Sequence, residues 1–218
     1  MKISAKTINI LKNFTAVNPS IVIKPGNKIK TISTSRTVLA SAEVMDTFER
    51  PVAIYNLSQF LACLSMFTDP DVEFGDGSAV ISDNNNSFVY YYADPSIILT
   101  PPDKDLVIPS VDAEFKLEAK DLSNVLKAMS ILELPEVAVV GDGETISIQA
   151  LDTRNSGSNI FKIDVGSTTR VFKAVFKAEN LKIANDSYQV IISSKGIAKF
   201  TGNEATYFIT IEANSSTF

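Results

Sequence analysis

The chain has 218 residues, of which 45% are hydrophobic and 21% charged, and its formal net charge is -5. This composition is ordinary for a globular protein with a core, and no apolar run approaches the roughly 20 residues of a membrane-spanning helix. The absence of histidine excludes Ser-His-Asp and Cys-His catalysis and most zinc sites, and the single cysteine, Cys63, excludes an internal disulfide. An enzyme would have to rely on carboxylates, Lys or Tyr, and the sequence offers no catalytic pair of acids. We expect no enzyme, no metal and no cofactor.

The first ten residues read as an amphipathic helix and not as a signal peptide. Helical spacing predicts a helix over 3–16, with Ser4 as its N-cap. Its buried stripe consists of Ile3, Thr7, Ile10, Leu11 and Phe14.

Three further helices are predicted at 56–67, 118–132 and 177–183, since apolar residues recur there every three or four positions. Asn56 suits the N-cap of the first of them, and Pro135 stops the chain after the second. Cys63 falls in the apolar stripe of 56–67, so we interpret it as a buried hydrophobic residue.

The segments between the helices alternate apolar and polar residues, which is typical of antiparallel strands in hairpins. Examples are 20–33, 71–82, 87–93, 136–151, 159–165 and 206–213. Between or beside them lie KPGNK (24–28), TDPD (68–71), GDGS (75–78), SDNNN (82–86) and GDGE (141–144). We interpret these as hairpin turns, because Gly and Asp have the turn chemistry and none has the spacing of a calcium loop.

Two sequence marks recur in the same order. Lys-Ile-Ser-Ala-Lys at 2–6 resembles Lys-Leu-Glu-Ala-Lys at 116–120, and Ala-Ile-Tyr at 53–55 resembles Ala-Val-Phe at 174–176. The order of helices and strands recurs with them, which indicates a duplicated α+β domain. We place the domains at 1–93 and 111–218.

The segment 94–110 joins the two predicted domains. It carries four of the nine prolines and is otherwise apolar. Proline favours an extended chain, and a free linker would be polar, so we expect this connector to lie on the body and border a hydrophobic groove.

The first and third predicted helices carry lysine opposite their buried stripes. On a helical wheel of the first helix, Lys2 and Lys6 fall together with Asn9 and Asn13. On the wheel of the third helix, Lys120 and Lys127 fall together on one side. Neither face has a carboxylate near its centre, although the chain is acidic overall. Such a face is either simply solvated or contacts phosphates without reading bases. Since no aromatic residue shares it, a duplex fits better than a single strand.

These features resemble the DNA sliding clamps of T-even-like bacteriophages. The similarity is colinear and runs through LKNF (11–14), VAIYNLSQFL (52–61), ADPS (93–96), EAKDL (118–122) and GIAKFTGNEATYFITIEANS (196–215). The resemblance implies a clamp fold of two similar domains, three chains of which form a ring with sheets outside and helices lining the hole.

The resemblance also implies the function. Such a ring encircles duplex DNA and tethers the replicative DNA polymerase for processive synthesis, through a C-terminal peptide of the polymerase held in a hydrophobic pocket. An ATP-dependent clamp loader closes the ring on DNA, and late-transcription factors use the loaded clamp. The expected place is the cytoplasm of the infected bacterial host, without a membrane.

The resemblance assigns three groups of residues. DNA-facing positions are Lys6, Lys12, Lys120, Lys127 and Lys177, with Lys2, Lys182, Lys195 and Lys199 in addition. The partner-peptide pocket is assigned to Val44, Met45, Ile97, Leu99, Val107, Ile108, Pro109, Ala213 and Phe218. The subunit interface is assigned to Phe88, Val89, Tyr90, Tyr91, Tyr92, Asn159, Ile160, Phe161 and Ile163, as edge strands that pair across chains. The alternative is a β-rich phage assembly protein without a DNA role.

Overall fold

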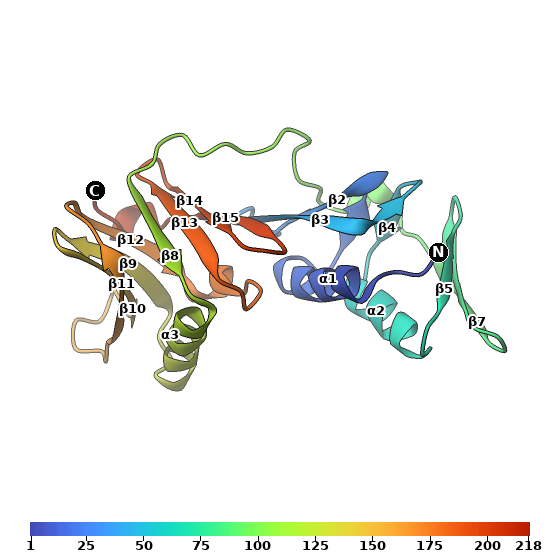
Figure 1. Ribbon diagram of the computed structural model, residues 1–218, viewed down its shortest axis with the longest axis horizontal. Helices are drawn as coiled ribbons and strands as arrows, with labels where there is room; N and C mark the ends of the chain where they lie inside the picture. Colours follow the sequence, from blue (N-terminus) through green and yellow to red (C-terminus); the bar gives the residue numbers. More distant parts are fainter. The chain divides into compact units, whose positions relative to one another are not determined.

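The computed structural model describes residues 1–218, which form two compact units, Met1–Asp103 and Lys104–Phe218 (Figure 1). The division falls inside the predicted connector. No helix is long and apolar enough to cross a membrane.

The first unit contains two helices and seven strands. In chain order they are α1 (Ala5–Val17), β1 (Ile21–Ile23), β2 (Gly26–Ile32), β3 (Val38–Phe48), β4 (Val52–Ile54), α2 (Leu57–Ser65), β5 (Asp71–Phe74), β6 (Ser78–Ser82), β7 (Ser87–Tyr91) and the 3-10 turn η1 (Pro95–Ile97). All strand pairs are antiparallel: β1 with β4, β2 with β3, and β5-β6-β7 as a three-stranded sheet.

The second unit contains one helix and eight strands. They are β8 (Ala113–Leu117), α3 (Ala119–Ile131), β9 (Glu136–Asp142), β10 (Thr145–Leu151), β11 (Phe161–Ser167), β12 (Val171–Lys177), η2 (Ala178–Leu181), β13 (Tyr188–Ser193), β14 (Ile197–Thr201), β15 (Thr206–Thr210) and η3 (Ala213–Ser215). One antiparallel sheet has the order β11-β10-β9-β12, and within this unit β8, β13, β14 and β15 pair in the order β8-β13-β14-β15.

The two units repeat one topology, as the sequence predicts. Helices α1 and α3 each have 13 residues and begin at the alanine of the repeated motif, Ala5 and Ala119. The strands after each helix pair alike, because β1 pairs with β4 and β9 with β12. Met1 exchanges two backbone hydrogen bonds with Val72 of β5. This contact corresponds to the pairing of β8 with β13 in the second unit. The structure therefore contains two similar α+β domains.

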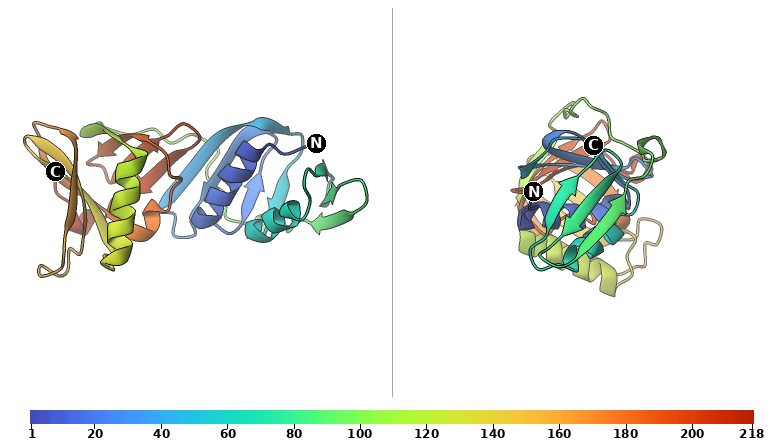
Figure 2. Two further views of the ribbon diagram at one scale, coloured as in Figure 1. Left: turned by 60° about the horizontal axis from the view of Figure 1, so that its bottom comes forward. Right: turned by 90° about the vertical axis from the view of Figure 1, so that its right-hand side faces the viewer.

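Each long helix covers strands of its own unit, α1 over β2 and β3 and α3 over β10 and β11 (Figure 2). On α1 the predicted residues Thr7, Ile10, Leu11 and Phe14 are buried, whereas Ile3 lies before the helix and is half-buried. Helix α2 buries Cys63 as expected. Burial of these stripes, and not helix propensity, supplies most of the stability of such short helices.

Three predictions of local structure are wrong. KPGNK joins β1 to β2, but β1 pairs with β4 and β2 with β3, so this turn does not close a hairpin. TDPD joins α2 to β5 and is no hairpin either. The predicted helix 177–183 is only the four-residue 3-10 turn η2, because Lys177 is still paired in β12. GDGS, SDNNN and GDGE do close the hairpins β5–β6, β6–β7 and β9–β10.

Candidate nucleic-acid interface

The outward face of α1 is basic and contains no acid. Lys6, Asn9 and Lys12 are exposed on it, opposite the buried stripe. The helix has no Asp or Glu at any position. A lysine face without a neighbouring carboxylate keeps its charge available to an anion in solution.

The outward face of α3 repeats this arrangement. Lys120 and Lys127 are exposed, while Leu122 and Val125 are buried against the sheet. The one acid, Asp121, is half-buried in the first turn, where a negative charge stabilises the helix dipole.

A strand side chain holds the N-terminus of α1. Asp46 of β3 accepts hydrogen bonds from the Ser4 hydroxyl at 2.6 Å, from the Ser4 N–H at 3.1 Å and from the Thr7 hydroxyl. Partial burial disfavours the charged form, but these hydrogen bonds outweigh it and lower the pKa of Asp46. The start of the helix, and with it the direction of Lys6, is thus tied to the sheet.

The N-terminus of α3 is held in a similar way by a different residue. The Ala119 N–H donates to the Ser187 hydroxyl at 3.1 Å, and that hydroxyl donates to Glu118 at 2.9 Å. Glu118 also pairs with Lys116 at 2.7 Å. Both basic helices therefore begin at a side-chain contact with a segment far away in the sequence.

The other predicted DNA-facing lysines lie off the long helices. Lys2 pairs with Asp69, and Lys177 ends β12 at 3.9 Å from Glu212. Lys182 follows η2. Lys195 and Lys199 are in the β13–β14 hairpin, the latter with its ammonium 5.9 Å from the Phe208 ring.

Helix α2 is neutral. Its exposed residues are Ser58, Gln59, Ala62 and Ser65, and it has no basic side chain. This helix offers no cation to a phosphate.

The predicted pocket residues differ in exposure. Val44 is buried, with 4% of its surface exposed, whereas Met45 is 85% exposed and Val107 is 83% exposed. Phe218 stacks on Phe172 with ring centroids 6.2 Å apart, and Thr217 bridges Lys173 of β12. The remaining members are exposed (Ile97, Pro109, Ala213) or half-buried (Leu99, Ile108).

The first part of the predicted connector borders a small pocket. It has a volume of about 180 Å³, and its lining includes Val22, Pro25, Pro101 and Pro102 together with Lys24, Lys28 and Lys30. Lys24 pairs with Asp103, and Lys30 donates to the Asp103 carbonyl at 3.0 Å. This part of the connector lies on the body of the first unit.

The two predicted interface segments are edge strands of their sheets. Strand β7 ends the sheet β5-β6-β7, and β11 ends the sheet β11-β10-β9-β12. On β7, Phe88, Val89 and Tyr91 are exposed, while Tyr90 is buried against Phe60. The other named members are exposed (Asn159, Ile160) or half-buried (Tyr92, Phe161, Ile163), and burial raises the pKa of Tyr92 to about 12.

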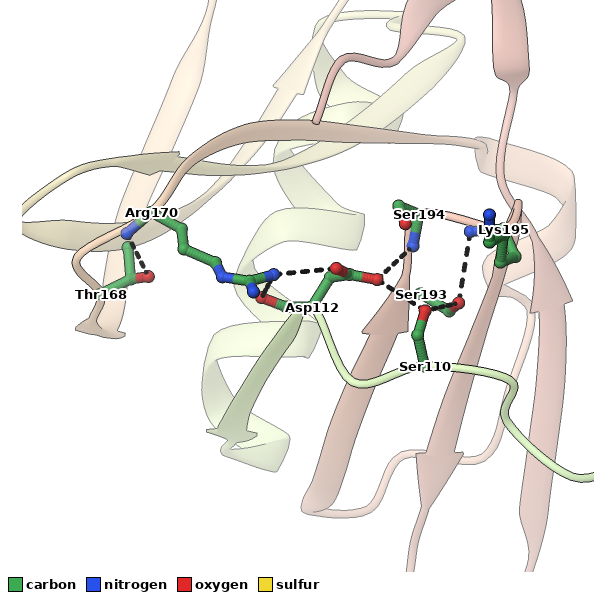
Figure 3. A network of polar contacts seen from close by, with 7 residues as sticks. All are labelled: Ser110, Asp112, Thr168, Arg170, Ser193, Ser194 and Lys195. Carbon is green, nitrogen blue, oxygen red and sulfur yellow. Dashed lines mark hydrogen bonds and ion pairs between the residues drawn. The ribbon is translucent and has the colours of Figure 1, made fainter.

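A network around Asp112 fixes the start of the second unit (Figure 3). The Asp112 carboxylate accepts hydrogen bonds from the Ser194 N–H at 2.8 Å and the Ser110 hydroxyl at 2.7 Å, and it pairs with Arg170 at 2.8 Å. The Ser194 N–H first, then the Ser110 hydroxyl, hold the pKa of Asp112 far below its usual range. The network joins the end of the connector to two hairpins of the unit.

Comparison with known proteins places this geometry in a family. The model of the DNA polymerase processivity factor matches residues 2–99, and that of the gp45 sliding clamp, C terminal, matches residues 114–213. A sliding clamp of Vibrio phage KVP40 is 33% identical over 98% of this chain and 100% of its own. The chain belongs to the sliding clamp family of bacteriophages. The sliding clamp of Enterobacteria phage T4 is 30% identical over 99% of both chains.

The fold agrees with this membership. A solved structure of A. fulgidus PCNA, bound to the C-terminal region of FEN-1, superposes with a TM-score of 0.71, covers 97% of both chains and is 12% identical. At that identity the likeness concerns the clamp fold alone. The predicted resemblance and fold are confirmed, and the family favours a clamp over the assembly-protein alternative.

Two exposed arginines lie outside the residues that the resemblance assigns. Arg36 and Arg154 are exposed in the β2–β3 and β10–β11 hairpin loops. An alignment of the two repeats would reveal both arginines, because the β2–β3 and β10–β11 hairpins are equivalent. Such an alignment depends on knowing which strands pair.

Proposed function

We propose that three copies of this clamp form a closed ring around duplex DNA, with α1 and α3 of each copy facing the DNA. The observation that carries the proposal is the pair of equivalent helices, both with lysine and without acid at the centre of the outward face. On an acidic chain, this is where a polyanion meets the least repulsion.

The proposed mechanism is topological. The ring stays on DNA because it is closed, and the lysine contacts centre the duplex without gripping it. Contacts to phosphates carry no sequence information and weaken with salt, so the ring can slide. The net charge of -5 disfavours DNA on the remaining surface. The chain acts as a scaffold and catalyses no reaction of its own.

The proposed partners follow from the family resemblance. The clamp tethers the replicative polymerase through a C-terminal peptide of the polymerase. Exposed apolar residues available to such a peptide are Met45 and Ile97 in the first unit, and Val107 in the second unit taken by itself. A clamp loader opens and closes the ring with ATP, and late-transcription factors bind the loaded ring. The protein acts in the cytoplasm of the infected host.

The proposed subunit contact pairs β7 of one copy with β11 of the next. Both are edge strands with unpaired backbone groups on one side, which a second chain can satisfy. Apolar side chains stand beside each edge. Ile160 precedes β11 and is 63% exposed, and Tyr91 on β7 is 77% exposed. Such residues gain from burial in an interface.

Topology is tested by loading the clamp, with the cognate loader and ATP, onto a closed circular duplex and onto the same duplex made linear. The closed circle should retain the clamp after free clamp is washed away, and the linear DNA should lose it over its ends. Equal retention on both would rule out the encircling mechanism.

Assembly is tested by light scattering over a range of concentrations. The expected mass is about 71 kDa, three times the chain mass of 23.7 kDa. Val89→Lys on β7 should shift the equilibrium toward the single chain, while Ser58→Lys on α2 should not. A single chain at high concentration would contradict the ring.

A further inference from the structure

The four arginines of the chain occupy two pairs of equivalent turns in the repeat. Arg36 and Arg154 lie in the β2–β3 and β10–β11 hairpin loops, and Arg50 and Arg170 lie in the β3–β4 and β11–β12 connections. These connections leave opposite ends of the hairpins, so the two pairs lie at opposite ends of their units.

The two pairs differ in their contacts. Arg50 pairs with Asp76 at 2.6 Å, and Arg170 pairs with Asp112 at 2.8 Å. The side chains of Arg36 and Arg154 are exposed and take part in no ion pair, and only their backbone N–H groups are bonded, to Ser33 and Asp152. Because no carboxylate of the chain pairs with them, the side chains of Arg36 and Arg154 are available to an external anion.

The unpaired arginines lie at the C-terminal ends of the two basic helices. Asn18, the C-cap of α1, donates its side-chain amide to the Ile32 carbonyl at 2.8 Å, directly before the loop of Arg36. In the second unit, the Thr153 N–H donates to Glu136 at 2.8 Å, shortly after α3 ends. Figure 1 shows the β10–β11 loop extending on the side of the sheet where α3 lies.

The last turns of α1 and α3 carry no cation of their own. The C-terminus of a helix carries a partial negative charge, which repels phosphate, and neither α1 nor α3 has a basic residue in its last turn. Lys6 and Lys120 lie near the helix starts, and Lys12 and Lys127 lie before the last turn, so the last turn itself has no cation. A guanidinium there restores the attraction, and its geometry suits phosphate.

We propose that Arg36 and Arg154 contact phosphates of the duplex, one in each repeat, and extend the basic face past the C-terminal ends of α1 and α3. This inference rests on the proposed function. It assigns a binding role to two loops outside the helices.

The test measures how tightly the ring threads onto a short, fluorescently labelled linear duplex with free ends, by anisotropy over a series of salt concentrations. The double variant Arg36→Gln with Arg154→Gln should bind about threefold to tenfold more weakly at low salt, with a shallower salt dependence. The variant Arg36→Lys with Arg154→Lys should recover most of the affinity, because the charge is restored.

Two controls separate the outcomes. Arg50→Gln removes the same charge at the opposite end of the first unit and should bind like the unaltered chain. Lys6→Gln with Lys120→Gln tests the proposed helix face itself and should weaken binding. Suppose that Lys6→Gln with Lys120→Gln weakens binding, and that Arg36→Gln with Arg154→Gln binds like Arg50→Gln. This inference is then overturned and the proposed function stands. If Lys6→Gln with Lys120→Gln also binds like the unaltered chain, the proposed DNA-facing surface of α1 and α3 is wrong.

Light scattering on the same variants addresses the subunit contact. The β10–β11 loop borders the edge strand β11, so a change in it could act on assembly. An unchanged mass supports the phosphate contact. A loss of the ring in the Arg36 and Arg154 variant would show that these arginines contact a neighbouring chain and would overturn the inference.

Discussion

Asp46, in the long strand β3, accepts a hydrogen bond of 2.6 Å from the hydroxyl of Ser4, the N-cap of α1. The two residues are far apart in sequence, and their contact joins the start of a basic helix to the sheet beneath it. Because the sheet fixes where the helix begins, it also fixes which way Lys6 and Lys12 point. Together with the buried stripe of α1, this contact orients the charges of the helix.

Replacement of Asp46 should loosen α1. Asp46→Asn removes a charged acceptor of three hydrogen bonds and should lower the free energy of unfolding by about 1–3 kcal/mol. Urea denaturation measures this. Glu43→Gln, an exposed change on the same strand, is the control and should stay within about 0.5 kcal/mol. Equal stability of the two variants would mean that Asp46 does not hold the helix.

Two neighbouring residues on α1 should separate stability from function. Leu11 is fully buried, so Leu11→Ala should cost about 2–5 kcal/mol through lost burial and a cavity. Lys12 is exposed, so Lys12→Ala should leave stability nearly unchanged but weaken processive synthesis at raised salt. Denaturation and primer extension measure the two effects. A strongly destabilised Lys12→Ala would refute its exposed position.

The equivalent lysines of the two repeats should act together. Lys6→Glu with Lys120→Glu places acid on both helix faces and should weaken loading and processivity without unfolding the chain, in a salt-sensitive way. Primer extension with the cognate loader and polymerase is the measurement, with circular dichroism as the fold control. Unchanged DNA synthesis would refute the assigned inner face.

The Asp112 network should protect the end of the connector. Asp112→Asn weakens the ion pair with Arg170 and should lower the stability of the chain by about 1–3 kcal/mol. It should also speed tryptic cleavage after Lys104, which is exposed in the connector. Asp164→Asn, an exposed change on β11, serves as the control. Cleavage at the same rate in both variants would show that the network does not restrain the connector.

Acid should destabilise the protein through carboxylates that the fold keeps ionised. The pKa values of Asp46 and Asp112 are lowered from 3.8, and hydrogen bonds from the Thr145 and Glu144 N–H groups lower the pKa of Asp142 to about 2. A lowered folded pKa adds stability above the unfolded value, and that stability is lost as pH falls through the folded value. Stability should therefore be flat near neutral pH and fall below about pH 4.

The variant Asp46→Asn with Asp112→Asn isolates this effect. It should be less stable at neutral pH, and its stability should fall less steeply between about pH 4 and pH 2, because two of the titrating groups are gone. Thermal unfolding across that range measures the slope. The same slope in both proteins would assign the acid sensitivity to other groups.

Local sequence patterns were sufficient for the elements that depend on near neighbours. Helices at 3–16, 56–67 and 118–132 were predicted because an apolar stripe every three or four residues has only one way to be buried, and α1, α2 and α3 lie there. The hairpins at GDGS, SDNNN and GDGE follow from turn chemistry in the same way. The duplication can also be predicted from the sequence, because the motifs at 2–6 and 53–55 recur in the same order at 116–120 and 174–176.

Long-range pairing decided what the patterns could not. KPGNK has the residues of a hairpin turn, yet β1 pairs with β4, because pairing is chosen by the whole sheet and not by the turn alone. The local pattern predicts a helix from Lys177, but this residue pairs with Glu136 as the last residue of β12. Only strand pairing shows that Arg36 and Arg154 occupy equivalent hairpins, since sequence distance says nothing about which loops share an end of a sheet.

The sequence alone determined that two lysine-bearing helices exist and that acid avoids the centre of their outward faces, because both properties depend on residues within one or two turns. The tertiary structure decided where those faces point, through Asp46 and Ser187, and which loops stand at the helix ends. Direction and neighbourhood depend on contacts between residues far apart in the chain, and such contacts form only when the sheet is assembled.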